Sequence, residues 1–125
     1  MKATVGAVVS VALILSAGAA MAQSAESGER TFNQQCKACH TVEKGGASPI
    51  GPNLFGVIGR PAGTAAGYTA SEAMKKSGIT WDEAALSEYL KDPKGKVPGG
   101  KMAYVGLKQA NRVGDVIAYL KKATQ

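Results

Sequence analysis

The feature that most constrains this chain is a pair of cysteines, Cys36 and Cys39, followed at once by His40. These residues are the whole cysteine and histidine content of the 125-residue sequence, so its thiol and imidazole chemistry is confined to five positions. In the pattern Cys-x-x-Cys-His, two thiols add to the two vinyl groups of a haem and the adjacent imidazole coordinates the iron. Two intervening residues let one helical turn span the porphyrin edge. The motif therefore predicts one covalently attached haem c.

Three other kinds of site use two cysteines at this spacing: a structural disulfide, a thiol redox pair and half of a zinc site. A thiol oxidoreductase motif is expected near a βαβ pattern, which this sequence lacks. A structural zinc needs four ligands, whereas the chain offers only two cysteines and one histidine. Haem attachment is therefore the interpretation that we adopt.

The first 22 residues have the pattern of an export signal. A positive charge near the start precedes an almost uninterrupted apolar run at 5–15, and residues 20–22 have the small-x-small pattern of a cleavage site. An uncleaved membrane anchor is the alternative, but the run falls short of the ~20 residues that span a bilayer. We expect cleavage before Gln23, which leaves one periplasmic domain of residues 23–125.

Composition limits what this domain can be. The sequence has one Trp, two Phe and four Tyr against sixteen Gly and five Pro, so a core made of side chains alone would be thin. The net charge is +6, or +5 without the lysine of the signal, which indicates acidic partners. Export and the presence of only three arginines argue against nucleic acid.

Apolar periodicity and turn residues predict a helical domain without a sheet. Residues 45–67 carry seven glycines and three prolines and should form a long ordered loop, which needs something to pack against. The expected helices are 25–36, a short one at 71–76, one that starts with a Thr80/Glu83 capping box and stops at Asp92-Pro93, and a terminal one ending near Lys122.

A second axial ligand must come from outside the motif, because the chain has no other histidine. Met1 and Met21 leave with the signal, so Met74 and Met102 remain. Met102 follows a glycine-rich loop that can lie flat against a ring, whereas Met74 falls in an expected helix at core-like spacing. We assign Met102 as the ligand, which raises the reduction potential relative to two histidines.

The whole mature chain resembles class I cytochrome c of the mitochondrial-like type. The resemblance rests on the stretches CKACHTVEKGG, GPNLFGVIGR, AGY, GITW, EYLKDPK, VPGGKMAYVGLK and DVIAYLKK, in the order of that family. It implies an all-α fold in which the N- and C-terminal helices cross, with short inner helices and long loops wrapped around one covalent haem. It also implies that Gly28 and Phe32 cross the terminal helix at Val116 and Tyr119.

The same resemblance implies further haem contacts. Pro52 would accept a hydrogen bond from the His40 ring, Arg60 and Trp81 would hold a buried propionate, and Tyr89 would approach the Met102 sulfur. The chain departs from the family pattern where a tyrosine for the inner propionate is usual, and Tyr68 or Ser71 would then take its place. The departures are Ala70, Met74 and Gly100 around the haem, and Val113 with Arg112 in the terminal helix.

The function implied is a single-electron carrier, not an enzyme, of a respiratory, photosynthetic or dehydrogenase chain. It would bind no small-molecule substrate and no nucleic acid and would be a monomer. Its partners would be redox proteins with acidic docking surfaces, such as membrane reductase or oxidase complexes or a periplasmic dehydrogenase. The alternatives are an open sixth position for gas or peroxide chemistry, and a subunit tethered to one complex. The lysines expected to ring the haem edge are Lys37, Lys94, Lys96, Lys101 and Lys108.

Overall fold

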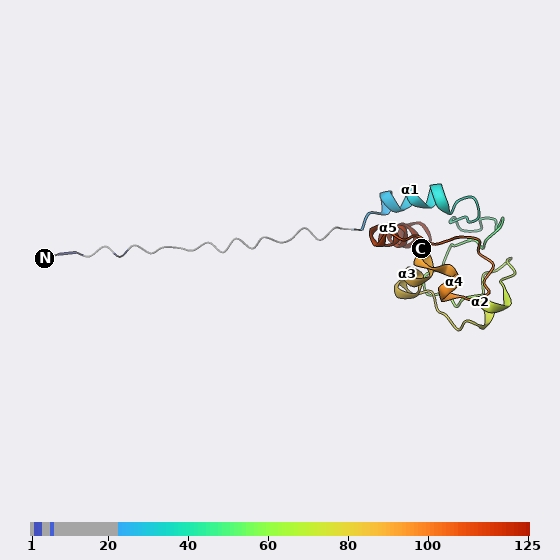
Figure 1. Cartoon of the computed structure of the whole chain (residues 1–125). Helices are drawn as coiled ribbons and strands as arrows, with labels where there is room; N and C mark the ends of the chain where they lie inside the picture. The colour runs from blue at the N-terminus through green and yellow to red at the C-terminus, as the bar shows by residue number, and fades with distance from the viewer. Residues whose placement is uncertain (1, 4–5, 7–22) are drawn as a thin grey trace.

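The computed structural model describes residues 2–3, 6 and 23–125, so the predicted signal peptide falls almost wholly outside the described residues. Between residues 23 and 125 the only pairing of extended segments is an isolated bridge between Pro61 and Thr80. The all-α prediction is confirmed. The helices, shown in Figure 1, are α1 (Ala25–Gln35), α2 (Glu72–Lys76), α3 (Glu83–Lys91), α4 (Pro93–Lys96) and α5 (Ala110–Ala123).

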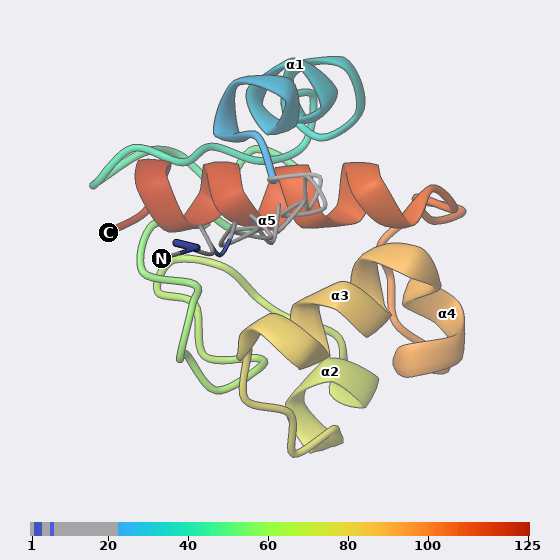
Figure 2. The ribbon, with the colours of Figure 1, turned by 90° about the vertical axis from the view of Figure 1, so that its left-hand side faces the viewer.

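The first and last helices cross in contact, as expected (Figure 2). The crossing is close because Gly28 has no side chain: a Cβ placed there would lie 1.9 Å from the carbonyl oxygen of Asp115. One turn later the Phe32 ring meets Tyr119, with ring centroids 5.4 Å apart. The helix glycine, which costs about 1 kcal/mol relative to alanine, is thus explained by a tertiary contact.

The core is built around α5, which packs against α1 on one side and α3 on another (Figure 2). The apolar positions of α5 recur at three- and four-residue spacing and are buried, as the terminal-helix prediction requires. Burying each such side chain stabilises the fold by about 1.5–3 kcal/mol. The same cluster includes Phe32 of α1 and Leu86 and Tyr89 of α3, and the residues of α5 in it are Val113, Val116, Ile117 and Leu120.

The predicted start of α3 is wrong. Asp82, not Thr80, is the N-cap, and its side chain accepts a hydrogen bond from the backbone N–H of Ala85. Thr80 is held in extended backbone by its bridge to Pro61, and the next residue, Trp81, donates its N–H to the Arg60 carbonyl. The helix therefore begins only after the chain has left this pairing.

A short helix, α4, was not predicted. Asp92-Pro93 does end α3, but Pro93 then opens α4, since proline is tolerated at the first position of a helix. The Asp92 side chain accepts a hydrogen bond from the Gly95 N–H, 3.1 Å away, and so caps this helix. The stop signal for one helix is the start signal of the next.

The long segment 45–67 contains no helix, as predicted, and is tied to the rest of the domain by backbone hydrogen bonds. Gly51 N–H donates to Cys39 O (2.8 Å), and Gly56 N–H donates to Thr124 O (2.8 Å). The segment is thereby tied to the cysteine motif and to the residue that follows α5. None of the helices described between residues 23 and 125 has the length and apolar character needed to cross a membrane.

Candidate haem site

The cysteine motif forms a turn that continues the C-terminal end of α1. Cys36 caps the helix, its N–H donating to Phe32 O, and the N–H groups of Cys39 and His40 both donate to Cys36 O at 3.0 Å. All three side chains of the motif are half-buried. The two thiols and the imidazole therefore lie on one turn of the chain, as attachment along one porphyrin edge requires.

The His40 ring is oriented by the chain that crosses it. Its Nδ1 lies 2.9 Å from the Pro52 carbonyl oxygen, so Nδ1–H donates there and Nε2 is left as the free coordinating atom. Burial lowers the pKa of His40, which favours the neutral ring that a metal needs. A Cβ at Gly51 would lie 2.4 Å from Cε1 of this ring, so only glycine lets the backbone pass.

The Cys36 thiol does not have the character of a catalytic redox cysteine. Burial, reinforced by the nearby Cys39, raises the pKa of Cys36 to about 11, whereas catalytic cysteines have a lowered pKa. Both cysteines are free thiols in the structure. Within the described residues no three His, Cys, Asp or Glu side chains gather into a metal site, which leaves no full ligand set for a structural zinc.

Met102 lies in the segment between α4 and α5, and its sulfur is contacted by Tyr89 of α3. The Tyr89 hydroxyl donates to Met102 Sδ across 3.7 Å. Burial, and secondarily Tyr68, raises the pKa of Tyr89 to about 12, so the hydroxyl stays a donor at neutral pH. Met74 lies in α2, as expected, and both methionines are partly buried against the core. The choice of Met102 as the ligand stays a prediction.

Arg60 and Trp81 lie on the two paired extended segments. The Arg60 guanidinium donates to the carbonyls of Phe55 (3.2 Å) and Asn53 (3.3 Å), and burial lowers its pKa, although a guanidinium remains charged. The buried Trp81 ring packs on Tyr89 with centroids 4.9 Å apart. The structure thus links the candidate propionate residues to the tyrosine that contacts Met102.

The two residues considered as replacements for Ala70 have different surroundings. The Ser71 hydroxyl caps α2 by accepting the N–H of Met74. The Tyr68 ring lies 4.8 Å below the Lys101 ammonium, which also donates to the Thr69 carbonyl. The Ser71 hydroxyl only accepts in this cap and keeps its own O–H to donate, so both residues stay candidates for the haem contact.

The donor set and its surroundings fit a haem. Two thiols, an oriented imidazole and a thioether are present, and a set of apolar side chains packs against the core without being fully buried. Such partly exposed apolar surface is what a flat apolar group would cover. The set includes Cys36, Val42, Leu54, Ile58, Met74, Ile79, Leu90, Met102 and Tyr104.

Three features of the site were not found from the sequence. Gly51 passes against the His40 ring, and Asn53 donates to the Thr41 hydroxyl, 2.7 Å away, within the loop that carries Pro52. The Tyr104 hydroxyl donates to the Gln35 side chain. In the sequence, only the position of Gly51 next to Pro52 pointed to one of these features. The other two contacts join exposed or half-exposed polar residues, and no spacing in the sequence predicts that they meet.

The comparisons with known proteins agree with this geometry. The family profile described as Cytochrome c matches residues 25–124. The chain is 50% identical over 97 residues to a cytochrome c of Chlamydomonas reinhardtii, covering 78% of this chain and 87% of that one. It is 46% identical over 110 residues to cytochrome c2 of Blastochloris viridis, covering 88% and 86%. It is 57% identical over 86 residues to cytochrome c2 iso-2 of Magnetospirillum fulvum, covering 69% and 88%.

Proposed function

The chain belongs to the cytochrome c family and is therefore an electron carrier with covalently attached haem c, and from this premise we propose which of its residues hold the haem and ligate the iron. Cys36 and Cys39 form the two thioether bonds, and His40 and Met102 are the axial ligands. When bound, the haem supplies a one-electron couple between ferric and ferrous iron. The remaining residues hold these groups in place.

The hydrogen bond between His40 and Pro52 is the observation that carries this proposal. A metal-bound histidine almost always donates its other ring N–H to a carbonyl or carboxylate, which fixes the tautomer and raises ligand basicity. Here Nδ1 meets the Pro52 oxygen at 2.9 Å, while Gly51 allows the backbone to pass the ring. Nε2 is thus directed to the iron, and its neighbours on the chain are the two thiols.

Met102 would supply the second protein ligand to the iron. A coordinated thioether sulfur keeps a lone pair that can accept a weak hydrogen bond, and the Tyr89 hydroxyl is placed to donate it. Both axial positions are then filled by protein, so the site rearranges little between oxidation states. This arrangement supports outer-sphere electron transfer without binding or transforming a substrate.

Arg60, Trp81 and Tyr68 are the residues proposed to hold the propionates. Arg60 is partly buried and charged, with its guanidinium fixed by two carbonyls of the 53–55 segment. A buried cation of this kind favours a carboxylate partner. The indole N–H of Trp81 and the hydroxyl of Tyr68 would be the other donors; Tyr68 is near enough to Tyr89 to raise its pKa.

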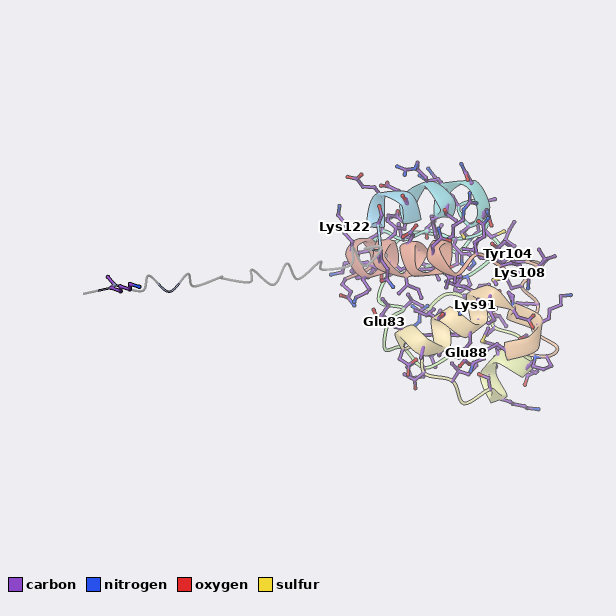
Figure 3. The ribbon with its side chains drawn as sticks, turned by 60° about the vertical axis from the view of Figure 1, so that its left-hand side comes forward. Glu83, Glu88, Lys91, Tyr104, Lys108 and Lys122 are labelled. Atoms are coloured by element: carbon purple, nitrogen blue, oxygen red, sulfur yellow. The ribbon has the colours of Figure 1, made fainter. Side chains whose placement is uncertain are left out.

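For location and partners, we propose an exported periplasmic monomer that docks through its lysine-rich side to acidic surfaces of larger redox complexes. The export pattern at residues 1–22 and the net charge of +6 support this. In Figure 3, Lys108 and Lys91 lie on the same side of the molecule as Tyr104, and Lys122 lies on the opposite side. N-terminal sequencing of the mature protein should begin at Gln23.

Visible spectroscopy of the holoprotein tests the ligand set. We expect reversible one-electron reduction, a weak sulfur-to-iron absorption near the red edge of the ferric spectrum, and no change when carbon monoxide meets the ferrous form. A closed methionine site resists that gas. Ready formation of a carbon monoxide complex would contradict the proposal and indicate an open sixth position.

A further inference from the structure

The segment 101–106, which carries Met102, is held in place without backbone pairing. Its flanks are anchored: Gly100 N–H donates to Val97 O (3.0 Å) and Leu107 N–H donates to Leu90 O (2.7 Å). Between them, residues 101–106 make no backbone–backbone hydrogen bond to any residue in the described part of the chain. A segment of this kind opens more easily than a helix, so its side-chain contacts decide its position.

Three side-chain hydrogen bonds hold the segment, in addition to the contact of the Lys101 ammonium with the Tyr68 ring. Two of them reach the part of the chain that precedes α4: Lys101 donates to the Thr69 carbonyl (2.5 Å), and Met102 accepts from Tyr89. The third contact, from the Tyr104 hydroxyl to the Gln35 side-chain oxygen, reaches across 69 positions of sequence. It ends on the last residue of α1, immediately before Cys36.

The Tyr104 contact is thus the one of the three that joins the Met102 segment to the haem-attachment turn. Its neighbour Val105 is 84% exposed and contributes no anchor. The Tyr104 ring packs partly buried against the core, while Gln35 is exposed at the end of its helix. If the hydrogen bond were lost, Tyr104 would be held by the packing of its ring alone.

We propose that Tyr104 and Gln35 form a clasp that holds the 101–106 segment against the haem-attachment turn and thereby sets how often Met102 leaves the iron. The inference rests on the proposed function, in which Met102 is the axial ligand. Both are positioning residues, because neither touches the iron: they act through the segment that carries the ligand.

A double-mutant cycle in the ferric holoprotein tests the clasp. Tyr104→Phe and Gln35→Leu each remove one partner, and the double variant removes both. Tyr119→Phe deletes the same hydroxyl from α5 and is the matched control. Two quantities are measured: the exchange rates of the hydrogen-bonded backbone amides of Gly100 and Leu107, which flank the segment, and the affinity for added imidazole, which displaces Met102 and removes its red-edge absorption.

Each single variant should speed amide exchange and tighten imidazole binding by a factor of roughly 2 to 10, the effect of one neutral hydrogen bond. The double variant should match the singles, because the second change removes nothing further. The clasp is overturned if the singles behave like Tyr119→Phe, or if their effects add. Absence of the red-edge band in the wild type would overturn only the assignment of Met102 as the ligand. The clasp would still be tested, because amide exchange measures the opening of the segment directly.

Discussion

The carbonyl oxygen of Asp115 in α5 occupies the place where a side chain at Gly28 of α1 would begin, 1.9 Å from the ideal Cβ position. The Cα of Gly28 and the carbonyl of Asp115 are both parts of a helix backbone, so neither can move unless its helix moves. Gly114, next to Asp115, has different neighbours: the three atoms nearest to its Cβ would be side-chain atoms of Gln23, at 2.9–3.2 Å. Two helix glycines of one crossing therefore differ in what a methyl group would displace.

Gly28→Ala should destabilise the holoprotein, although alanine favours a helix by about 1 kcal/mol. Overpacking of a fixed contact costs about 1–3 kcal/mol and the backbone clash lies at the upper end, so we expect a net loss of about 1–2 kcal/mol. Guanidinium denaturation measures it. Gly114→Ala is the control and should be neutral or slightly stabilising, because the Gln23 side chain can turn away. Equal stability of the two variants would contradict this account of the crossing.

Met102→Ala should abolish the sulfur-to-iron absorption and lower the reduction potential, because a strong determinant of that potential is lost. Met74→Ala should do neither, since this methionine lies in helix α2, outside the glycine-rich segment that carries Met102. Ferric spectra and redox titration of both variants measure the contrast. The assignment would be reversed if only Met74→Ala removed the band.

Removal of the haem should abolish stable folding. The apolar side chains around the site pack against the core but remain partly exposed, and the domain has few large apolar residues with which to close over them. Expression without a haem-attachment system, followed by far-ultraviolet circular dichroism and thermal melting, measures the effect. The apoprotein should have little helix and no cooperative transition. A fully helical apoprotein with a sharp transition would show that the haem is not needed for the core.

Salt should slow electron transfer with an acidic partner. The Debye length falls from ~30 Å at 0.01 M to ~10 Å at 0.1 M ionic strength, so a steered second-order rate should fall roughly tenfold or more over that range. Stopped-flow kinetics with one acidic redox partner measures the rate. A rate independent of salt would remove the docking role of the basic surface.

Charge reversal separates the docking side from the rest of the surface. Lys37 adjoins the cysteines and Lys94 lies in α4, and both are exposed, so Lys37→Glu and Lys94→Glu should each lower the rate several-fold at low salt. Lys122→Glu is the control, because Lys122 lies on the side of the molecule away from Tyr104 (Figure 3). Lys101 is a poorer probe, since its ammonium also holds Thr69. Equal rates for the three variants would argue against a localised docking side.

Much of the fold was predictable because its causes are local. The three-and-four spacing of apolar residues predicted the terminal helix, and a glycine-rich stretch predicted the long loop. The start of α3 was not predictable in this way. Thr80 and Asp82 are both suitable caps by residue type, and the pairing of Thr80 with Pro61, 19 positions earlier in the chain, decided between them.

The haem motif is a property of the sequence alone, because covalent attachment needs two thiols and an imidazole at fixed spacing on one turn, and that spacing is visible without a fold. The prediction of Met102 over Met74 as the ligand also rests on local composition. The contact between Tyr104 and Gln35 does not, because it depends on where a segment without backbone pairing comes to rest against α1. That position is set by many weak contacts acting together, from Lys101 at one end to Leu107 at the other, and only the tertiary structure decides it.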